Sequence, residues 1–289
     1  ETGGLLFAAA VRLSAAELAI VNPASAYPEG PSVVDGVLYY AEMGSDRVMR
    51  FDGTGNSAVW TREGCGPTSV VPAGETLIVL CHREEVVVRI GHDGALVEII
   101  DHDRAGRPFA DPNAGTSDGR GGVYFSSSGI FAPGARATGA ILHLDADGTL
   151  TRVAENIRYA NGVVLSPDGE TLYASEHLAR RVLAFDVAAD GSLSGRRVFV
   201  ALDDLEGADP GRSWELGPDG LAMDRDGNLI VAEYGAGHLL VVGPDAKLRA
   251  TVPVPRDYVT SSALNADQTM LYITAPASLA APDEAGAVY

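Results

Sequence analysis

The chain has 289 residues, of which 46% are hydrophobic and 21% charged, and its 21 Lys and Arg residues face 39 Asp and Glu residues, for a formal net charge of −18. This composition is typical of a globular protein with an ample apolar core. An acidic chain without a basic stripe argues against partners such as nucleic acid or anionic membranes. No apolar run reaches the ~20 residues that a membrane-spanning helix needs.

A turn followed by a short apolar strand recurs along the chain at intervals of about 40 to 60 residues. The strands that follow these turns are Val37–Glu42, Leu77–Cys81, Val123–Ser127, Leu172–Glu176, Leu229–Glu233 and Leu271–Thr274. Units of this length with four short strands are typical of propeller blades. The sequence therefore predicts an all-β fold, a six-bladed β-propeller with four-stranded antiparallel blades. A sandwich or a solenoid is the alternative, although the same strand order in every unit argues against a sandwich.

The two ends of the chain predict how the ring closes. Glu17–Asn22 has no partner within the first unit, and the last unit stops at Gly286–Tyr289. A propeller commonly completes its final blade with a strand from the other terminus, which removes two exposed sheet edges. We expect this closure, a single domain over residues 17–289 and an N-terminal extension over residues 1–16. Leu5–Val11 resembles a signal-peptide core without a basic flank, so the cytoplasm and the periplasm or exterior both stay open.

Both cysteines fall in the second unit. Cys65 precedes its first strand and Cys81 ends its second strand. Adjacent antiparallel strands bring these two ends together, so a disulfide is geometrically possible, and a pair of reduced, buried thiols is equally compatible. A disulfide would favour an oxidising compartment.

The first strand of each propeller blade lines the central channel, so the residues at which these strands begin meet at one end of it. Four of the six starting segments carry an oxygen-bearing side chain: Glu29, Asn113, Asn161 and Asp219. Two carboxylates and two amides suit a hard divalent cation and leave positions for water or substrate. Without His or Cys in the set, we expect Ca²⁺, with Zn²⁺, Mn²⁺ and Mg²⁺ as alternatives. Each residue alone is more readily explained as a turn former, and it is their shared phase in the repeat that favours a site.

Three segments carry a resemblance to a known family: Ala26–Pro31, Asn161–Gly169 and Pro218–Leu229. From about residue 18 to residue 289 the chain resembles the senescence marker protein/gluconolactonase/luciferin-regenerating-enzyme-like family. The resemblance implies a six-bladed propeller with a divalent cation, usually calcium, in its channel, and lactone hydrolysis by many members. The ligand pattern of the family falls on the same four residues.

The third unit departs from the family pattern. Members usually have Asn-Asp here, often with Arg two positions before the Asn, whereas this chain has Asp111, Pro112, Asn113 and Ala114. The departure removes a cation that would contact a sugar and a carboxylate that would orient Asn113. The resemblance therefore implies the cation site without fixing the substrate.

The resemblance and the four oxygen-bearing residues together predict metal-assisted hydrolysis of a small lactone or related ester. In this reaction the cation polarises the carbonyl and water attacks it. Asp219 is the candidate catalytic base, although a carboxylate on a cation has a lowered pKa and the cation itself could activate the water. His82, His177 and Tyr234 directly follow the second strands of the second, fourth and fifth units. We expect them to bind substrate or, as the simpler alternative, to support the site through hydrogen bonds. Trp214 lies in the long segment 203–216, which could cover the channel.

Other functions stay open at this stage. A phosphotriesterase-type hydrolase would share the propeller and the cation. A non-catalytic cation- or metabolite-binding propeller would use the same site without chemistry, and the Ala114 departure favours it. A strictosidine-synthase-like condensation fits less well because the set of cation ligands is so complete. The sequence does not predict the oligomeric state.

Overall fold

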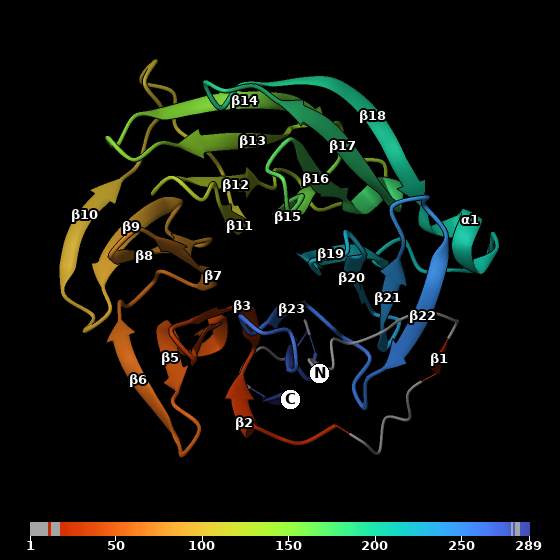
Figure 1. Cartoon of the computed structure of the whole chain (residues 1–289), viewed down its shortest axis with the longest axis horizontal. Coiled ribbons are helices and arrows are strands. Elements are labelled where there is room, and N and C mark those ends of the chain that lie inside the picture. The colour runs from red at the N-terminus through yellow and green to blue at the C-terminus, as the bar shows by residue number, and fades with distance from the viewer. Residues whose placement is uncertain (1–10, 13–17, 279, 281–283) are drawn as a thin grey trace.

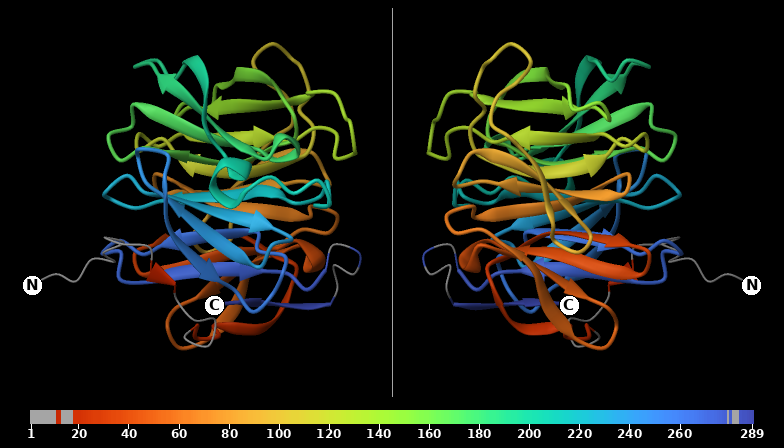
Figure 2. Two further views of the ribbon diagram at one scale, coloured as in Figure 1. Left: turned by 90° about the vertical axis from the view of Figure 1, so that its right-hand side faces the viewer. Right: turned by 90° about the vertical axis from the view of Figure 1, so that its left-hand side faces the viewer.

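The computed structural model describes residues 11–12, 18–278, 280 and 284–289. Six antiparallel sheets stand as blades around a central channel, and the first strand of each blade faces that channel (Figure 1). Figure 2 shows the same blades from the side, stacked face against face. The predicted six-bladed propeller is confirmed.

From the channel outward, the first blade consists of β3 (Pro28–Val34), β4 (Val37–Glu42), β5 (Arg47–Phe51) and β6 (Asn56–Thr61). The second consists of β7 (Pro67–Ala73), β8 (Thr76–Cys81), β9 (Val86–Gly91) and β10 (Leu96–Ile100). The third consists of β11 (Pro112–Ser117), β12 (Val123–Ser127), β13 (Gly139–Leu144) and β14 (Leu150–Ile157). The fourth blade consists of β15 (Ala160–Leu165), β16 (Thr171–Glu176), β17 (Arg181–Val187) and β18 (Leu193–Ala201). The fifth consists of β19 (Gly217–Met223), β20 (Leu229–Tyr234), β21 (His238–Val242) and β22 (Leu248–Pro253). The sixth consists of β23 (Ser261–Leu264), β24 (Leu271–Ala275), β25 (Ala285–Val288) and β2 (Asn22–Ala26).

The short helices lie at strand ends. A 3-10 turn follows β4 at Met43–Ser45, another follows β16 at His177–Ala179, and α1 (Leu202–Glu206) follows β18. Within the described ranges, none of the helices is long and apolar enough to cross a membrane.

Local turn chemistry explains the hairpins inside each blade. Between β15 and β16 the turn closes through a hydrogen bond from the Gly169 amide to the Ser166 carbonyl, 2.9 Å long. Gly169 has a φ of 74°, a conformation that glycine adopts without steric cost. The side chain of Asp168 accepts the amide of Glu170 at 2.9 Å. The Pro-Asp-Gly signal in the sequence therefore marks the turn that sets the register of this hairpin.

The apolar core is divided among the gaps between blades. Each of six clusters joins the facing sides of two neighbouring blades, such as Ile78 and Leu80 of the second blade with Phe125 and Leu142 of the third. The cluster around Leu38, Tyr40 and Val288 joins the first blade to the last. Few members of these clusters, Val163 and Leu221 among them, also line the channel, which leaves most of its wall to polar side chains and glycines.

The ring closes as predicted, with a strand from the N-terminal part of the chain added to the last blade. The closing strand is β2, which pairs antiparallel with β25, so the expectation that Glu17–Asn22 forms this strand was wrong in position. β3 begins at Pro28, and the left-handed backbone of Tyr27 (φ 49°) makes the turn into it, so the residues directly before this turn form the closing strand, and the Val21 amide adds a hydrogen bond to the Val288 carbonyl at 2.8 Å. Glu17 itself lies outside the described residues.

Part of the expected N-terminal extension joins the fold. β1 (Val11–Arg12) pairs in parallel with β22 and adds a fifth strand to the fifth blade. The remaining residues of the extension, including most of Leu5–Val11, lie outside the described residues.

The two cysteines form a disulfide. Cys65 and Cys81 are joined with a Cα–Cα distance of 4.6 Å, and both side chains are fully buried. The bond ties the segment before β7 to the end of β8. These are the segments that carry Thr68 and His82 into the channel pocket described below.

Removing this disulfide should destabilise the protein substantially. The bond closes a loop with a sequence separation of 16 residues. A loop of this size restricts the unfolded chain enough to contribute about 3 kcal/mol to the free energy of unfolding. We expect the double variant Cys65→Ala/Cys81→Ala to lose about this amount in denaturant titrations, and the wild type to lose it on addition of reductant. Equal midpoints for the variant and the oxidised wild type would show that the bond does not restrain this fold.

Candidate functional site

Four oxygen-bearing residues meet where the first strands begin. Glu29 lies on β3, Asn113 on β11, Asn161 on β15 and Asp219 on β19, and all four are buried, with exposed fractions of 8%, 8%, 3% and 6%. All four line a pocket of about 100 Å³ at the channel mouth and a second cavity of about 40 Å³ deeper in the channel. They therefore form a layer across the channel between the two cavities, as their shared phase in the repeat predicts.

The same local irregularity aims each of these side chains into the channel. The pairing of first and second strands shifts register immediately after Glu29, between Pro112 and Gly115, between Ala160 and Val163, and between Pro218 and Leu221. A bulge of this kind bends the strand and redirects a side chain. The same shift occurs in the second blade, between Pro67 and Ser69, so it belongs to the repeat and gives the four residues one common direction.

Glycine follows three of the four because neighbouring first strands approach closely there. A Cβ added at Gly30 would lie 2.2 Å from the carbonyl oxygen of Thr68, and one at Gly162 would lie 2.3 Å from that of Asp219. Glu29, Asn161 and Asp219 lie within strands, so their dipeptides with glycine reflect this close packing. The alternative that these residues form turns does not hold.

The two carboxylates of the layer interact unfavourably in the absence of a positive charge. Burial raises the pKa of Glu29 well above its usual range, and the nearby charge of Asp219 raises it further. Burial likewise raises the pKa of Asp219, and a hydrogen bond from the Asn161 side chain only partly opposes this effect. Two buried carboxylates in contact with one pocket are stable as anions only with a cation between or beside them.

The amides of the layer fit a cation as well. The Asn113 side-chain nitrogen donates to the hydroxyl of Ser128 at 3.0 Å, which leaves its carbonyl oxygen for another partner. Asn161 Oδ1 is buried and lacks a hydrogen-bond partner among the described residues. An unpaired buried carbonyl oxygen beside two carboxylates is a donor set that hard, oxygen-preferring cations select. The residues present therefore fit a divalent cation.

The three residues expected to bind substrate all line the same pocket. His177 Nε2 lies 2.8 Å from the carbonyl oxygen of Glu215, which can only accept, so this nitrogen carries the hydrogen. Burial lowers the pKa of His177 to about 4, so the ring is neutral and its Nδ1, which has no partner among the described residues, presents a lone pair. Burial also lowers the pKa of His82, while Asp111, whose Oδ1 lies 3.7 Å from His82 Nε2, acts in the opposite direction. Tyr234 shares a hydrogen bond of 3.1 Å with the hydroxyl of Tyr27.

Sequence reasoning missed the aromatic residues Tyr27, Phe131 and Tyr159, which also line the pocket. Tyr27 and Tyr159 each lie two positions before a residue of the layer, and both have a left-handed backbone, with φ of 49° and 59°. Their phase in the repeat is a signal that could have found them. Phe131 lies in the loop between β12 and β13, outside the repeat, so its position depends on tertiary structure alone.

The expected lid residue Trp214 does not line this pocket, but it packs against Phe131, which does. Its ring is 4.9 Å from that of Phe131 and its side chain is 41% exposed. The segment 203–216 thus contributes one aromatic ring beside the pocket.

Comparison with known proteins identifies the family. Residues 27–277 match the family described as "SMP-30/Gluconolactonase/LRE-like region". The chain belongs to this family.

Two relatives of this SMP-30/gluconolactonase/LRE-like protein are named for lactone hydrolysis. L-arabinolactonase of Azospirillum brasilense is 33% identical over 163 residues, which is 56% of this chain and 51% of the relative, so the match spans about half of that enzyme. Pentonolactonase XacC of Haloferax volcanii is 27% identical over 244 residues, 82% of this chain and 76% of the relative. The crystal structure of a regucalcin of Agrobacterium tumefaciens, described as a calcium-binding protein, aligns over 97% of this chain and 94% of its own with a TM-score of 0.75. At 17% identity this likeness shows the fold alone.

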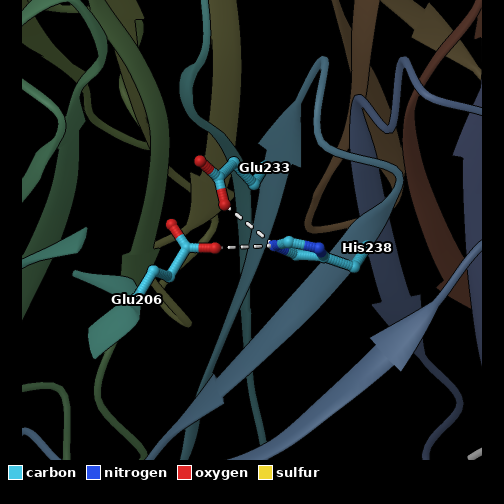
Figure 3. A group of neighbouring side chains, drawn as sticks. All are labelled: Glu206, Glu233 and His238. Atoms are coloured by element: carbon cyan, nitrogen blue, oxygen red, sulfur yellow. Dashed lines mark hydrogen bonds and ion pairs between the residues drawn. The ribbon is translucent and has the colours of Figure 1, made fainter. Parts of the chain in front are cut away.

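A second cluster of charged side chains in this SMP-30/gluconolactonase/LRE-like protein lies beside the channel. His238 Nε2 faces Glu233 at 2.8 Å and Glu206 at 3.2 Å, in the arrangement that Figure 3 shows. Arg180 reaches the same two carboxylates, at 2.8 Å and 3.0 Å. Two cationic side chains already balance the two carboxylates, so we interpret this group as an ion-pair network.

The repeat explains why these residues lie together. Glu233 lies next to the end of the second strand β20 and pairs across the sheet with His238, which begins the third strand β21. In the first blade Glu42 pairs in the same way with Arg47, and in the fourth blade Glu176 pairs with Arg181. His238 therefore occupies a position that arginine fills elsewhere.

The contribution of His238 to stability should depend on pH. Burial lowers the pKa of His238, but the carboxylates of Glu206 and Glu233 outweigh burial and raise it to about 9. Because folding raises this pKa above the ordinary value of 6.5, the charge stabilises the fold fully below pH 6.5, and its contribution is lost as the pH rises toward 9. We expect the wild type to lose about 2 kcal/mol more than His238→Gln over this interval, measured by urea unfolding. Parallel profiles for the two proteins would contradict the assignment.

Proposed function

We propose that this protein is a divalent-cation-dependent lactonase, with Glu29, Asn113, Asn161 and Asp219 holding the cation at the channel mouth. The observation that carries the proposal is the pair of buried carboxylates and the unpaired Asn161 oxygen on one pocket wall. Relatives named as lactonases support the reaction, and a donor set made only of carboxylate and amide oxygens supports Ca²⁺ as the ion. The substrate would be a small cyclic ester.

The chemistry divides between the cation and the side chains. A cation held by the four residues would act as a Lewis acid toward the carbonyl of the lactone. Asp219 is the base that accepts the proton of the attacking water. Burial raises the pKa of this carboxylate, whereas a neighbouring cation lowers it, so its basicity is set by the balance of the two.

The surrounding residues position the substrate and exclude water. Neutral His177 offers Nδ1 as a hydrogen-bond acceptor at the pocket wall. Burial raises the pKa of both Tyr27 and Tyr234, so their hydroxyls stay protonated and keep the hydrogen bond that joins the two rings. The four residues of the layer are buried, which strengthens the electrostatic interactions among them.

A substrate panel tests the reaction. We would measure acid release from γ-butyrolactone, dihydrocoumarin and D-glucono-1,5-lactone, with paraoxon and diisopropyl fluorophosphate as phosphorus esters. Hydrolysis of at least one lactone in preference to both phosphorus esters is the expected result. Turnover of the phosphorus esters alone would move the assignment to a phosphotriesterase, and no turnover with stoichiometric cation binding would move it to a binding protein.

A further inference from the structure

A continuous aromatic wall runs along one side of the pocket. Ring centroids are 4.9 Å apart between Trp214 and Phe131, 4.7 Å between Phe131 and Tyr159, and 5.7 Å between Tyr159 and His177. The wall continues from His177 to Tyr234 at 6.1 Å. Met43 adds a thioether to the pocket lining. Flat rings and a thioether offer large areas for apolar and stacking contacts.

Several polar groups that line the pocket already form hydrogen bonds within the protein. Thr68 Oγ1 faces the carbonyl oxygens of Leu80 and Pro112, at 3.3 Å and 3.2 Å. The hydroxyls of Tyr27 and Tyr234 bond to each other at 3.1 Å. Among the described lining residues, Nδ1 of His82 and Nδ1 of His177 are buried without a hydrogen-bond partner, and neither Lys nor Arg lines the pocket.

This lining suits a ligand with few polar groups. A lactone with a hydroxyl on each ring carbon would bury several donors against aromatic faces without partners, and each unpaired group carries a desolvation cost. An apolar or aromatic group would instead gain contact area along the wall. Because it concerns which lactone is opened, this inference rests on the proposed function.

We propose that the site selects lactones that carry or are fused to an aromatic or other apolar group, in preference to polyhydroxylated sugar lactones, and that Phe131 sets this selectivity. Phe131 contacts Tyr159, His177 and Trp214, so it joins the inner part of the wall to its rim. Its loop lies outside the strand repeat and is separate from the carboxylate layer.

The test compares kcat/KM for dihydrocoumarin, an aromatic δ-lactone, with that for D-glucono-1,5-lactone and γ-butyrolactone. We expect dihydrocoumarin to exceed the sugar lactone by at least about 10-fold. Phe131→Ala should reduce kcat/KM for dihydrocoumarin by about 10-fold, mainly through KM, and reduce that for γ-butyrolactone by a smaller factor, so that the ratio of the two values falls. Ile130→Ala is the matched control, because Ile130 is the adjacent residue, is 48% exposed and does not line the pocket, and it should retain both rates.

The outcomes separate this inference from the proposed function. Equal or faster hydrolysis of the sugar lactone, or an unchanged rate in Phe131→Ala, overturns the selectivity while the lactonase assignment stands. If no lactone is opened, the lactonase assignment fails. The aromatic subsite is then tested separately, by calorimetric measurement of the binding of 3,4-dihydroquinolin-2-one, the lactam that corresponds to dihydrocoumarin. Binding that is lost in Phe131→Ala supports the aromatic subsite, and absence of binding to the wild type overturns it.

Discussion

Asp219→Asn should reduce lactone hydrolysis by about 1,000-fold and abolish stoichiometric binding of a divalent cation. The substitution removes one of two buried carboxylates from the layer across the channel and removes the candidate base in the same step. The loss of one preorganised electrostatic group at a reaction centre typically costs 100-fold to about 1,000-fold, and here two roles end together. Initial rates and equilibrium dialysis against calcium measure the two effects.

Asp226→Asn is the matched control for this variant. Asp226 lies in the turn of the same blade, is exposed, and is absent from the channel pocket. The control loses the same formal charge and should keep both the rate and the cation. Full activity in Asp219→Asn would remove Asp219 from the reaction, and retained cation binding with lost activity would keep it as the base alone.

Removal of divalent cations should lower the stability of the wild type by about 3 kcal/mol, which corresponds to a fall of roughly 5 to 10 °C in Tm. The proposed cation would bind only the folded chain, in which burial and mutual repulsion otherwise disfavour the charged forms of Glu29 and Asp219. Thermal unfolding with calcium and with chelator measures the shift.

The Asp219→Asn variant should respond to chelator differently from the wild type. Its Tm should not respond to chelator, because its cation site is lost. In chelator it should unfold at a higher temperature than the wild type, since one of two repelling buried carboxylates is gone. A wild-type Tm that is identical with and without chelator would contradict a cation bound between these residues.

The sequence predicted the propeller and the place of the layer because both depend on the repeat. A polar residue at the same phase in four units implies the same position in four blades, and β3, β11, β15 and β19 show this arrangement. The bulge that aims these residues recurs with them. Turn dipeptides such as Asp168-Gly169 predicted where hairpins lie, because a tight turn depends on the few residues that form it.

Features outside the repeat could not be predicted in the same way. Phe131 lies in a loop whose position depends on its contacts with Tyr159 and Trp214. The ion pairs of Arg180 with Glu206 and Glu233 join residues far apart in the sequence. The closing strand was placed too early because the boundary depends on the turn at Tyr27, which only the structure shows.

The most direct test of the central claim measures bound cation and reaction rate in the same samples. Calcium is titrated into chelated protein, and the cation bound per chain is compared with the initial rate of lactone hydrolysis. We predict that the rate rises in proportion to occupancy and saturates at one cation per chain, and that Asp219→Asn shows neither. A full rate in cation-free protein would contradict the claim.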